Sequence, residues 1–208
     1  MTRPFPLCCA PFQPAQVSLH HIPYSISVTR IMSILVTYAT AKGSTREIAE
    51  RIASRLQDFA APIDCIPMKE VETAALPSYS AIIVGSAIHM ASWLSPANRF
   101  IRNNEQALKT KPVWAFSVGM PPQESDRVNE ERMIEEKIRK HVPDLRGHRL
   151  FQGRFYKQDL GWFLGMIFTC CVPRNKAKWG DERNWNDIEA WADKVGKEIK
   201  NGRPVGTD

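Results

Sequence analysis

Short runs of apolar residues recur along this chain, and most of the segments between them carry apolar residues at helical spacing. Runs of this length are typical of strands that are buried on both faces. The sequence predicts five strands, at residues 33–38, 62–67, 81–86, 112–117 and 148–155. Strands that alternate with helices imply crossover connections and a parallel sheet covered on both sides. We therefore predict an α/β fold, a doubly wound five-stranded parallel sheet in the order 2-1-3-4-5.

Capping signals place the beginnings of the first two helices. Residues 44–57 begin with Ser-Thr-Arg-Glu, the pattern of a capping box, in which Ser44 caps the helix and the side chain of Glu47 reaches back to the Ser44 amide. Ser95 is followed by proline, the pattern of a cap with proline at the first helical position. Both helices are expected to start at the loops that leave the first and third strands.

Two further helices are predicted nearer the C-terminus. Residues 126–141 are highly charged, and Val128, Ile134 and Ile138 are expected on one apolar side of that helix. Asn184 is expected to cap the last helix, in which apolar residues again recur at helical spacing. Together the elements predict one domain.

The folded domain is expected to cover residues 33–200, with a short tail at 201–208. Residues 1–31 are rich in proline and show neither helical nor strand periodicity, so we exclude them from the predicted fold. Two interpretations of this leader stay open. It is either a weak organellar targeting sequence or the product of an assigned start upstream of the true one at Met32.

Composition and charge narrow the classes of function. The chain is 43% hydrophobic and 24% charged, as soluble globular proteins are. Its formal net charge of +6 permits contact with anionic surfaces, but without a basic stripe interleaved with aromatics we predict no nucleic-acid binding. The five cysteines lack the C-x2-C spacing of a zinc site. We therefore expect no metal, and reduced thiols in a cytoplasmic compartment.

The loop after the first strand is the strongest candidate for a ligand site. In a sheet of this order, ligands bind beyond the carboxyl ends of the strands. Gly43 removes a side chain where a ligand must approach, and the free amides and dipole of the helix that follows favour an anion. The loop therefore predicts a phosphate site, although a capped helix without a ligand has the same features. The predicted cofactor-binding residues of this loop are Thr40, Ala41, Lys42, Gly43, Ser44 and Thr45.

The loops after the third and fourth strands leave the same edge of the sheet. Both are rich in small residues, which let the backbone approach a flat heteroaromatic ring. His89 and Trp93 are candidates to cover such a ring, but Trp93 could equally pack beside Leu94, and His89 could be a surface residue. No spacing indicates catalytic residues, so we expect a cofactor to carry any chemistry. The predicted cofactor-binding residues in these loops are Ser86, Ala87, Ile88, His89, Trp93, Ser117, Val118 and Gly119.

Several nucleotide-binding motifs are absent from the sequence. There is no G-x-x-x-x-G-K-[ST] and no G-x-G-x-x-G after a strand, which argues against a P-loop NTPase and a dinucleotide-binding domain. A phospho-acceptor receiver domain needs acidic residues at the ends of the first and third strands. Here those ends read Tyr-Ala-Thr and Gly-Ser, which are neutral.

Residues 38–45, Tyr-Ala-Thr-Ala-Lys-Gly-Ser-Thr, resemble the phosphate loop of flavodoxins, with Lys42 in place of the usual threonine. The similarity is closer to the flavodoxin-type protoporphyrinogen oxidase family of bacteria. That family shares Y-A-T-x-x-G-S-T, a G-S-A/S-I loop as at residues 85–88, and a segment like Gly-Asp-Glu-Arg-Asn-Trp at 180–185. Its members carry an insertion that corresponds to residues 158–179. The resemblance covers about residues 33–200.

This resemblance implies a flavodoxin-like fold, FMN as the cofactor, and a flavin-dependent oxidoreductase of heme biosynthesis. Its substrate would be a small molecule, protoporphyrinogen IX, and its electrons would pass to a quinone at a membrane. Three alternatives stay open: an electron carrier without its own substrate, an NAD(P)H-quinone reductase, and a flavin-free interaction module. Such carriers are usually strongly acidic, unlike this chain. A homo-oligomer also stays open.

The predicted insertion contains six large apolar side chains within residues 162–168. Each is worth about 1.5–3 kcal/mol on burial, so they must contact something. They either cover their own domain or meet a membrane, a quinone or a second subunit. Arg174, Lys176 and Lys178 follow, and basic residues beside an apolar patch suit an anionic bilayer surface. The run is too short to span a bilayer, so we expect at most peripheral membrane contact through residues 160–178.

Overall fold

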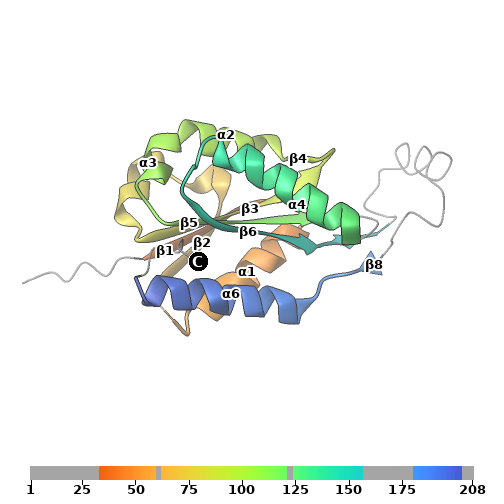
Figure 1. Ribbon diagram of the computed structural model, residues 1–208. Coiled ribbons are helices and arrows are strands. Elements are labelled where there is room, and N and C mark those ends of the chain that lie inside the picture. The colour runs from red at the N-terminus through yellow and green to blue at the C-terminus, as the bar shows by residue number, and fades with distance from the viewer. Residues whose placement is uncertain (1–32, 60–61, 121–123, 157–179, 203–208) are drawn as a thin grey trace, which may run out of the picture. The chain divides into compact units, whose positions relative to one another are not determined.

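The computed structural model describes residues 33–59, 62–120, 124–156 and 180–202, whose arrangement is shown in Figure 1. The leader at 1–31, the insertion at 158–179 and most of the tail lie outside the described residues. Parallel strands form the central sheet in the order β2-β1-β3-β5-β6, which confirms the predicted order. They are β1 (Ile34–Ala39), β2 (Ile63–Pro67), β3 (Ala81–His89), β5 (Val113–Gly119) and β6 (Leu145–Gln152).

Helices cover both faces of this sheet, as the alternation of elements predicts (Figure 1). One face packs against α1 (Ser44–Leu56) and α6 (Trp185–Lys200). The opposite face carries α2 (Ser95–Asn103), α3 (Glu105–Lys109) and α4 (Glu124–Arg139). Two 3-10 helices follow β2, namely η1 (Met68–Glu70) and η2 (Thr73–Ser78). The fold class is therefore the predicted doubly wound α/β architecture.

Strand β1 shows how the sequence builds two cores. Ile34, Val36 and Tyr38 belong to the core beneath α1 and α6, whereas Leu35 and Ala39 belong to the core on the other face. Successive side chains of a strand point to opposite faces, so an unbroken apolar run is what a sheet covered on both sides requires. Strand β1 is therefore buried on both faces, between the two layers of helices.

The two helices beneath the sheet are also joined by charge. Arg55 Nε and Nη2 donate to the two carboxylate oxygens of Asp193, at 2.6 and 3.0 Å. Arg51 donates to Glu189 at 2.9 Å, one turn nearer the helix start. The last helix is capped as predicted, because the side chain of Asn184 accepts a bond from the Asp187 amide at 3.2 Å.

The predicted loop at residues 86–93 is wrong, because most of it is strand. β3 continues to His89, turns at Met90 and Ala91, and returns as β4 (Ser92–Trp93) in antiparallel pairing. Both turn residues have positive φ, 50° and 53°. A two-residue turn with two left-handed residues matches the twist of a hairpin, and it usually contains Asn-Gly. Because the turn residues here are Met and Ala, a prediction based on glycine and asparagine does not detect this hairpin.

The predicted fifth strand at 148–155 is wrong in its bounds. β6 begins at Leu145 and ends at Gln152, and after Gly153 the chain forms a separate strand, β7 (Arg154–Phe155). β7 pairs in antiparallel fashion with β8 (Gly180–Asp181). The break has a packing reason: a Cβ atom at Gly153 would lie 2.9 Å from Val118 Cγ1, so the backbone comes too close to β5 for any side chain.

The predicted apolar side of the helix at 126–141 needs one correction. Ile134 and Ile138 are buried, but Val128 is 56% exposed. Six residues separate Val128 from Ile134, a rotation of about 240° around the helix axis, which places the two on different faces. The buried stripe instead continues from Ile138 to Val142, just beyond the end of α4.

Candidate functional site

Helix α1 begins directly after Gly43, which adopts φ +90°. The first bond into the helix runs from the Glu47 amide to the Gly43 carbonyl, at 3.0 Å. The amides of Ser44, Thr45 and Arg46 precede that bond and have no partner inside the helix. They therefore leave donors, and the positive end of the helix dipole, at the carboxyl edge of the sheet.

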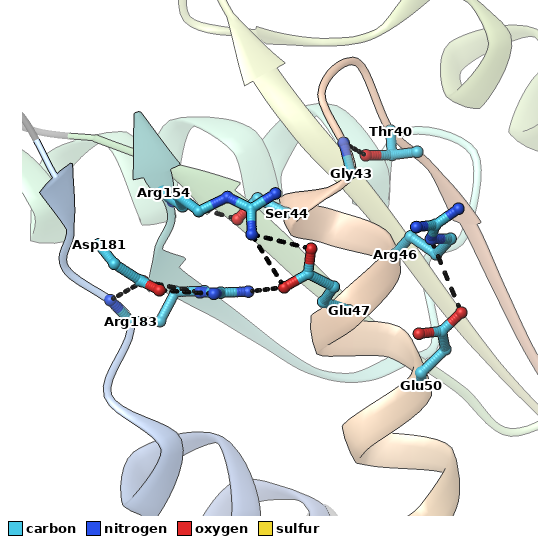
Figure 2. Close-up of polar contacts among 9 residues, drawn as sticks. All are labelled: Thr40, Gly43, Ser44, Arg46, Glu47, Glu50, Arg154, Asp181 and Arg183. Atoms are coloured by element: carbon cyan, nitrogen blue, oxygen red, sulfur yellow. Dashed lines mark hydrogen bonds and ion pairs between the residues drawn. The ribbon is translucent and has the colours of Figure 1, made fainter. Parts of the chain in front are cut away.

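The hydroxyl groups of the loop are set up as donors. Thr40 Oγ1 accepts a bond from the Gly43 amide at 3.0 Å, and Ser44 Oγ accepts one from the Arg154 amide at 3.1 Å (Figure 2). A hydroxyl that already accepts from an N–H group keeps its own proton for another partner. Thr45, which is only 1% exposed, adds a third hydroxyl. These residues fit a group that offers acceptors alone, such as a phosphate.

The predicted capping box does not form. Gly43 is the N-cap and makes no side-chain cap bond, and the Glu47 carboxylate turns instead to two arginines. Its Oε1 lies 3.0 Å from Arg154 Nη1 and its Oε2 lies 2.6 Å from Arg183 Nη1 (Figure 2). Charge-assisted bonds to two guanidinium groups are stronger than one bond to a neutral amide, which explains why Glu47 leaves the helix start uncapped.

Arg183 is the buried centre of this cluster. Its side chain is 5% exposed, donates from Nε to Asp181 Oδ1 at 2.7 Å, and lies over the Trp185 ring at 4.6 Å. The hydrogen bonds from Arg183 lower the pKa of Glu47 and the pKa of Asp181. Both carboxylates are therefore charged at neutral pH, and the four charges of Glu47, Asp181, Arg154 and Arg183 balance.

Arg154, Asp181 and Arg183 are absent from the predicted site, yet all three lie beside the loop. A signal for Arg154 was present, because the fifth strand of a parallel sheet ends at the same edge as the first, third and fourth. Arg183 falls in the segment 180–185 by which the sequence resembles a known family. Neither signal identifies Glu47 as the common partner, since its two arginines are 107 and 136 residues away in sequence.

The ends of β3 and β5 lie next to each other, as predicted. Ser86 pairs with Ser117 and Ala87 with Val118 across the two strands. The hydroxyls of both serines are fully engaged. Ser86 Oγ accepts from the Leu94 amide at 3.2 Å and donates to the Ala87 carbonyl at 2.9 Å. Ser117 Oγ accepts from Trp93 Nε1 at 2.7 Å and lies 2.7 Å from His148 Nε2. Any ligand contact of these two residues therefore falls to their backbone groups.

The two candidates for covering a ring have different fates. Trp93 is 4% exposed and donates its indole N–H inward, so the packing interpretation is right for this residue. His89 is exposed at the end of β3, beside Met90, which is 88% exposed. Ile88 is half-buried near the end of β5, where a Cβ atom at Gly119 would lie 3.4 Å from Ile88 Cδ1. The exposed residues His89 and Met90 thus lie at the turn of the β3–β4 hairpin, at the carboxyl end of β3.

Gly153 contacts both the loop at 40–45 and the end of β5. Its amide donates to the Gly119 carbonyl at 2.9 Å, and a Cβ atom there would lie 3.4 Å from Ser44 Oγ. The next residue, Arg154, is bonded to Ser44 through its backbone. The structure therefore brings together Ser44, Gly119 and Arg154, which sequence spacing alone does not connect.

Other features lie away from this loop. A cavity of about 580 Å³ between α2 and α4 is lined by Arg99, Arg102, Lys137 and Lys140 among others, and by no residue of the loop at 40–45. The described part of the chain contains no group of three His, Cys, Asp or Glu side chains that could hold a metal ion. Nor does any helix within the described ranges have the length and apolar character needed to cross a membrane.

Comparison with known proteins places these features in context. The family model for the flavodoxin domain matches residues 35–172. The protoporphyrinogen IX dehydrogenase [quinone] of Escherichia coli (strain K12) is 26% identical over 89 residues, which is 43% of this chain and 49% of that protein. The probable flavodoxin 1 of Bacillus subtilis (strain 168) is 35% identical over 52 residues, 25% of this chain and 33% of that protein. These matches span about half and about a third of the two relatives.

Solved structures agree on the fold. A flavodoxin from the domain Archaea superposes with a TM-score of 0.54 at 16% identity, over 81% of this chain and 99% of that one. The rubredoxin oxygen:oxidoreductase of Desulfovibrio gigas gives 0.54 at 11% identity, over 84% and 37%. The family match covers more than half of the sequence, and the donors of the first loop suit the phosphate of FMN. The chain therefore belongs to the flavodoxin domain family and binds FMN.

Proposed function

We propose that this protein is an FMN-dependent oxidoreductase that takes electrons from a reduced small molecule and passes them to a quinone. The observation that carries the proposal is the similarity to the Escherichia coli relative, whose name gives protoporphyrinogen IX as its substrate and a quinone as its acceptor. A porphyrinogen is accordingly the proposed substrate class.

The segment at 180–185 gives further support. It resembles the corresponding segment of the bacterial protoporphyrinogen oxidase family, and its Arg183 is fixed to Glu47 of α1 and to Asp181. The part of the chain that carries the family resemblance is thus bonded to the helix that follows the loop at 40–45.

FMN, when bound, supplies an acceptor for a hydride or an electron pair. The work of the chain is to bind and orient it. The donors of Thr40, Ser44 and Thr45 would hold the phosphate, and we expect backbone groups at the ends of β3 and β5 to position the ring.

The test is anaerobic turnover. The full chain, reconstituted with FMN, is mixed with protoporphyrinogen IX and a water-soluble quinone, and porphyrin formation is followed by its fluorescence. We expect a rate that depends on both FMN and quinone, with the apoprotein as the control for spontaneous oxidation. Porphyrin formation no faster than in the apoprotein sample would refute the proposed substrate while leaving FMN binding intact.

An electron carrier is the second candidate, favoured by the match to the probable flavodoxin of Bacillus subtilis. A carrier exchanges electrons with protein partners and has no substrate of its own. Carriers of this kind are usually strongly acidic, whereas the formal charge here is +6. Electron transfer to a protein acceptor without porphyrinogen turnover would favour the carrier, and consumption of NAD(P)H in the presence of quinone would indicate a quinone reductase.

We further propose a cytoplasmic location with peripheral membrane contact through residues 160–178, where a quinone would be met. The support is the sequence of that segment, apolar and then basic. These residues lie outside the described part of the chain.

A further inference from the structure

Arg154 lies at the loop Thr40–Thr45 through its backbone and its side chain. Its amide donates to Ser44 Oγ at 3.1 Å, and its Nη1 pairs with Glu47 Oε1 at 3.0 Å. The residue before it, Gly153, is bonded to β5 and packed against Ser44. The position of Arg154 is therefore fixed by the sheet as well as by its ion pair.

The Arg154 guanidinium keeps donors available at its edge, although its carbon lies 5.9 Å from the centre of the Tyr156 ring. Nη1 serves Glu47, while for Nε and Nη2 no acceptor is found within the described residues. Nη2 lies 3.9 Å from the position that a Cβ atom would take at Gly43. The free nitrogen is thus beside the residue whose missing side chain opens the loop (Figure 2). A guanidinium whose Nε and Nη2 donors are free is suited to phosphate oxygens.

Arg183 cannot play the same part. Two of its nitrogens are bonded to Asp181, a third is bonded to Glu47, and its side chain is 5% exposed. It serves to neutralise Glu47, which would otherwise present a bare carboxylate beside an incoming dianion. Glu47 lies as close to the Gly43 position as Arg154 does, at 3.9 Å, so this neutralisation is needed.

We propose that Arg154 is a specificity-determining residue that binds the FMN phosphate through its free guanidinium donor, held in place by the Glu47–Arg183–Asp181 cluster. The inference rests on FMN binding at the loop Thr40–Thr45 and is independent of the porphyrinogen substrate. It adds a positive charge to a site that hydroxyls and amides would otherwise form. The protein should accordingly discriminate between FMN and riboflavin, which lacks the phosphate.

The experiment measures the affinity of the full-length apoprotein for FMN and for riboflavin by flavin fluorescence. The variant is Arg154→Gln, which keeps a polar side chain and removes the charge. We expect its FMN affinity to fall by about 10- to 100-fold, the usual worth of a charge-assisted bond, while riboflavin affinity changes by less than about twofold. The FMN affinity of the parent should also depend more steeply on salt than that of the variant.

Arg51→Gln is the matched control. Arg51 lies on α1, is 49% exposed, and pairs with Glu189 on α6. This variant also removes one positive charge and should leave the ratio of FMN to riboflavin affinity unchanged. Equal loss in both variants would mean that net charge, and not Arg154, sets the preference.

Arg154→Lys covers the case in which Arg154→Gln does not fold. Lysine keeps the charge and the pair with Glu47 but loses the fork, so its affinity ratio should lie between those of the parent and riboflavin-like binding. A ratio like that of the parent in Arg154→Gln, or in Arg154→Lys if that alone folds, would overturn the inference. A parent that binds riboflavin as tightly as FMN would instead refute the phosphate site itself.

Discussion

Gly43 and Gly85 both matter through the side chain they lack, but for different reasons. Gly43 has φ +90°, and a Cβ atom there would make only ordinary van der Waals contacts, the nearest at 3.9 Å. Gly85 has an ordinary backbone, but a Cβ there would lie 2.0 Å from Phe116 Cζ. The first is a requirement of conformation and the second a requirement of packing.

Replacing Gly43 with valine should weaken FMN binding by at least roughly tenfold and cost about 1–2 kcal/mol of stability, because a β-branched residue resists a left-handed backbone. Both effects are measured together, by FMN titration and by thermal unfolding of the apoprotein. Gly202→Val is the matched control: it also has positive φ, 57°, and nothing within 4 Å. The control should share the loss of stability and keep FMN affinity. FMN binding by Gly43→Val at the parent's affinity would reduce the loop to a helix start.

Replacing Gly85 with alanine should destabilise the fold by about 1–3 kcal/mol, because the added Cβ would overlap the fully buried ring of Phe116. Phe116 packs against Phe151 and Trp191, with ring centres at 6.4 and 6.2 Å. Thermal unfolding should show a fall of about 2–4 °C per kcal/mol. Gly147→Ala is the comparison, because its Cβ would be an ordinary 3.6 Å from Trp114. Similar melting temperatures for the two variants would contradict the packing argument.

Among the site residues, local chemistry was predictable and long-range partners were not. The position of Gly43 between a strand and a helix is enough to indicate a ligand loop. The partners of Glu47 are two arginines that come near only in the folded protein. The pattern of four adjacent residues therefore predicted a capping box that does not form. Trp93 shows the same limit, because its hydrogen bond to Ser117 depends on a neighbouring strand.

Three strands are joined by a chain of side-chain hydrogen bonds. Trp93 of β4 donates to Ser117 of β5, and Ser117 Oγ lies 2.7 Å from His148 Nε2 of β6. Burial lowers the pKa of His148 to about 4, from an ordinary value of 6.5. The imidazole is therefore neutral in the folded protein at neutral pH.

This burial predicts an acid-sensitive fold. Between pH 6.5 and about 4 the unfolded chain binds a proton at His148 that the folded chain does not. Stability should therefore fall as the pH falls through that window, by about 1.4 kcal/mol per pH unit and roughly 3 kcal/mol in all. Denaturant unfolding at several pH values measures this. His148→Gln should flatten the dependence, whereas the exposed His89→Gln should keep it. An unchanged slope in His148→Gln would assign the acid sensitivity to other groups.

The elements themselves were predictable where burial decides them. The five parallel strands of the sheet were predicted, the fifth with wrong bounds, and the cap at Asn184 was correct because its partner is three residues away. The β3–β4 hairpin escaped notice because its turn is Met-Ala, which has no turn signature. The prediction that Val128 lies on the apolar side of α4 was wrong because it ignored the angle between Val128 and Ile134 around the helix axis.

In the molecule as a whole, the sheet order follows from the alternation of strands and helices, and with it the edge at which ligands bind. The residues that surround the loop do not follow from that order. Arg154 and Asp181 come from the short two-stranded sheet of β7 and β8, and Arg183 follows β8 directly.

That two-stranded sheet predicts a deletion that the domain should survive. Phe155 pairs with Gly180, so the two ends of the segment 157–179 are attached at adjacent points. Replacing residues 157–179 with a short Asn-Gly turn should leave a cooperative fold that binds FMN, measured by thermal unfolding and flavin titration. Its binding to anionic liposomes and its quinone reduction should drop, as the proposed membrane contact requires. Loss of FMN or of cooperative unfolding would show that the segment is core.

The same pairing has an evolutionary consequence. A segment whose two ends lie side by side can lengthen, shorten or be replaced without any change in the sheet. The fixed part is the β7–β8 pair, with Arg154 on one strand and Asp181 on the other. A change within residues 157–179 can therefore alter what the protein contacts at that point, while Arg154 keeps its bonds to Ser44 and Glu47.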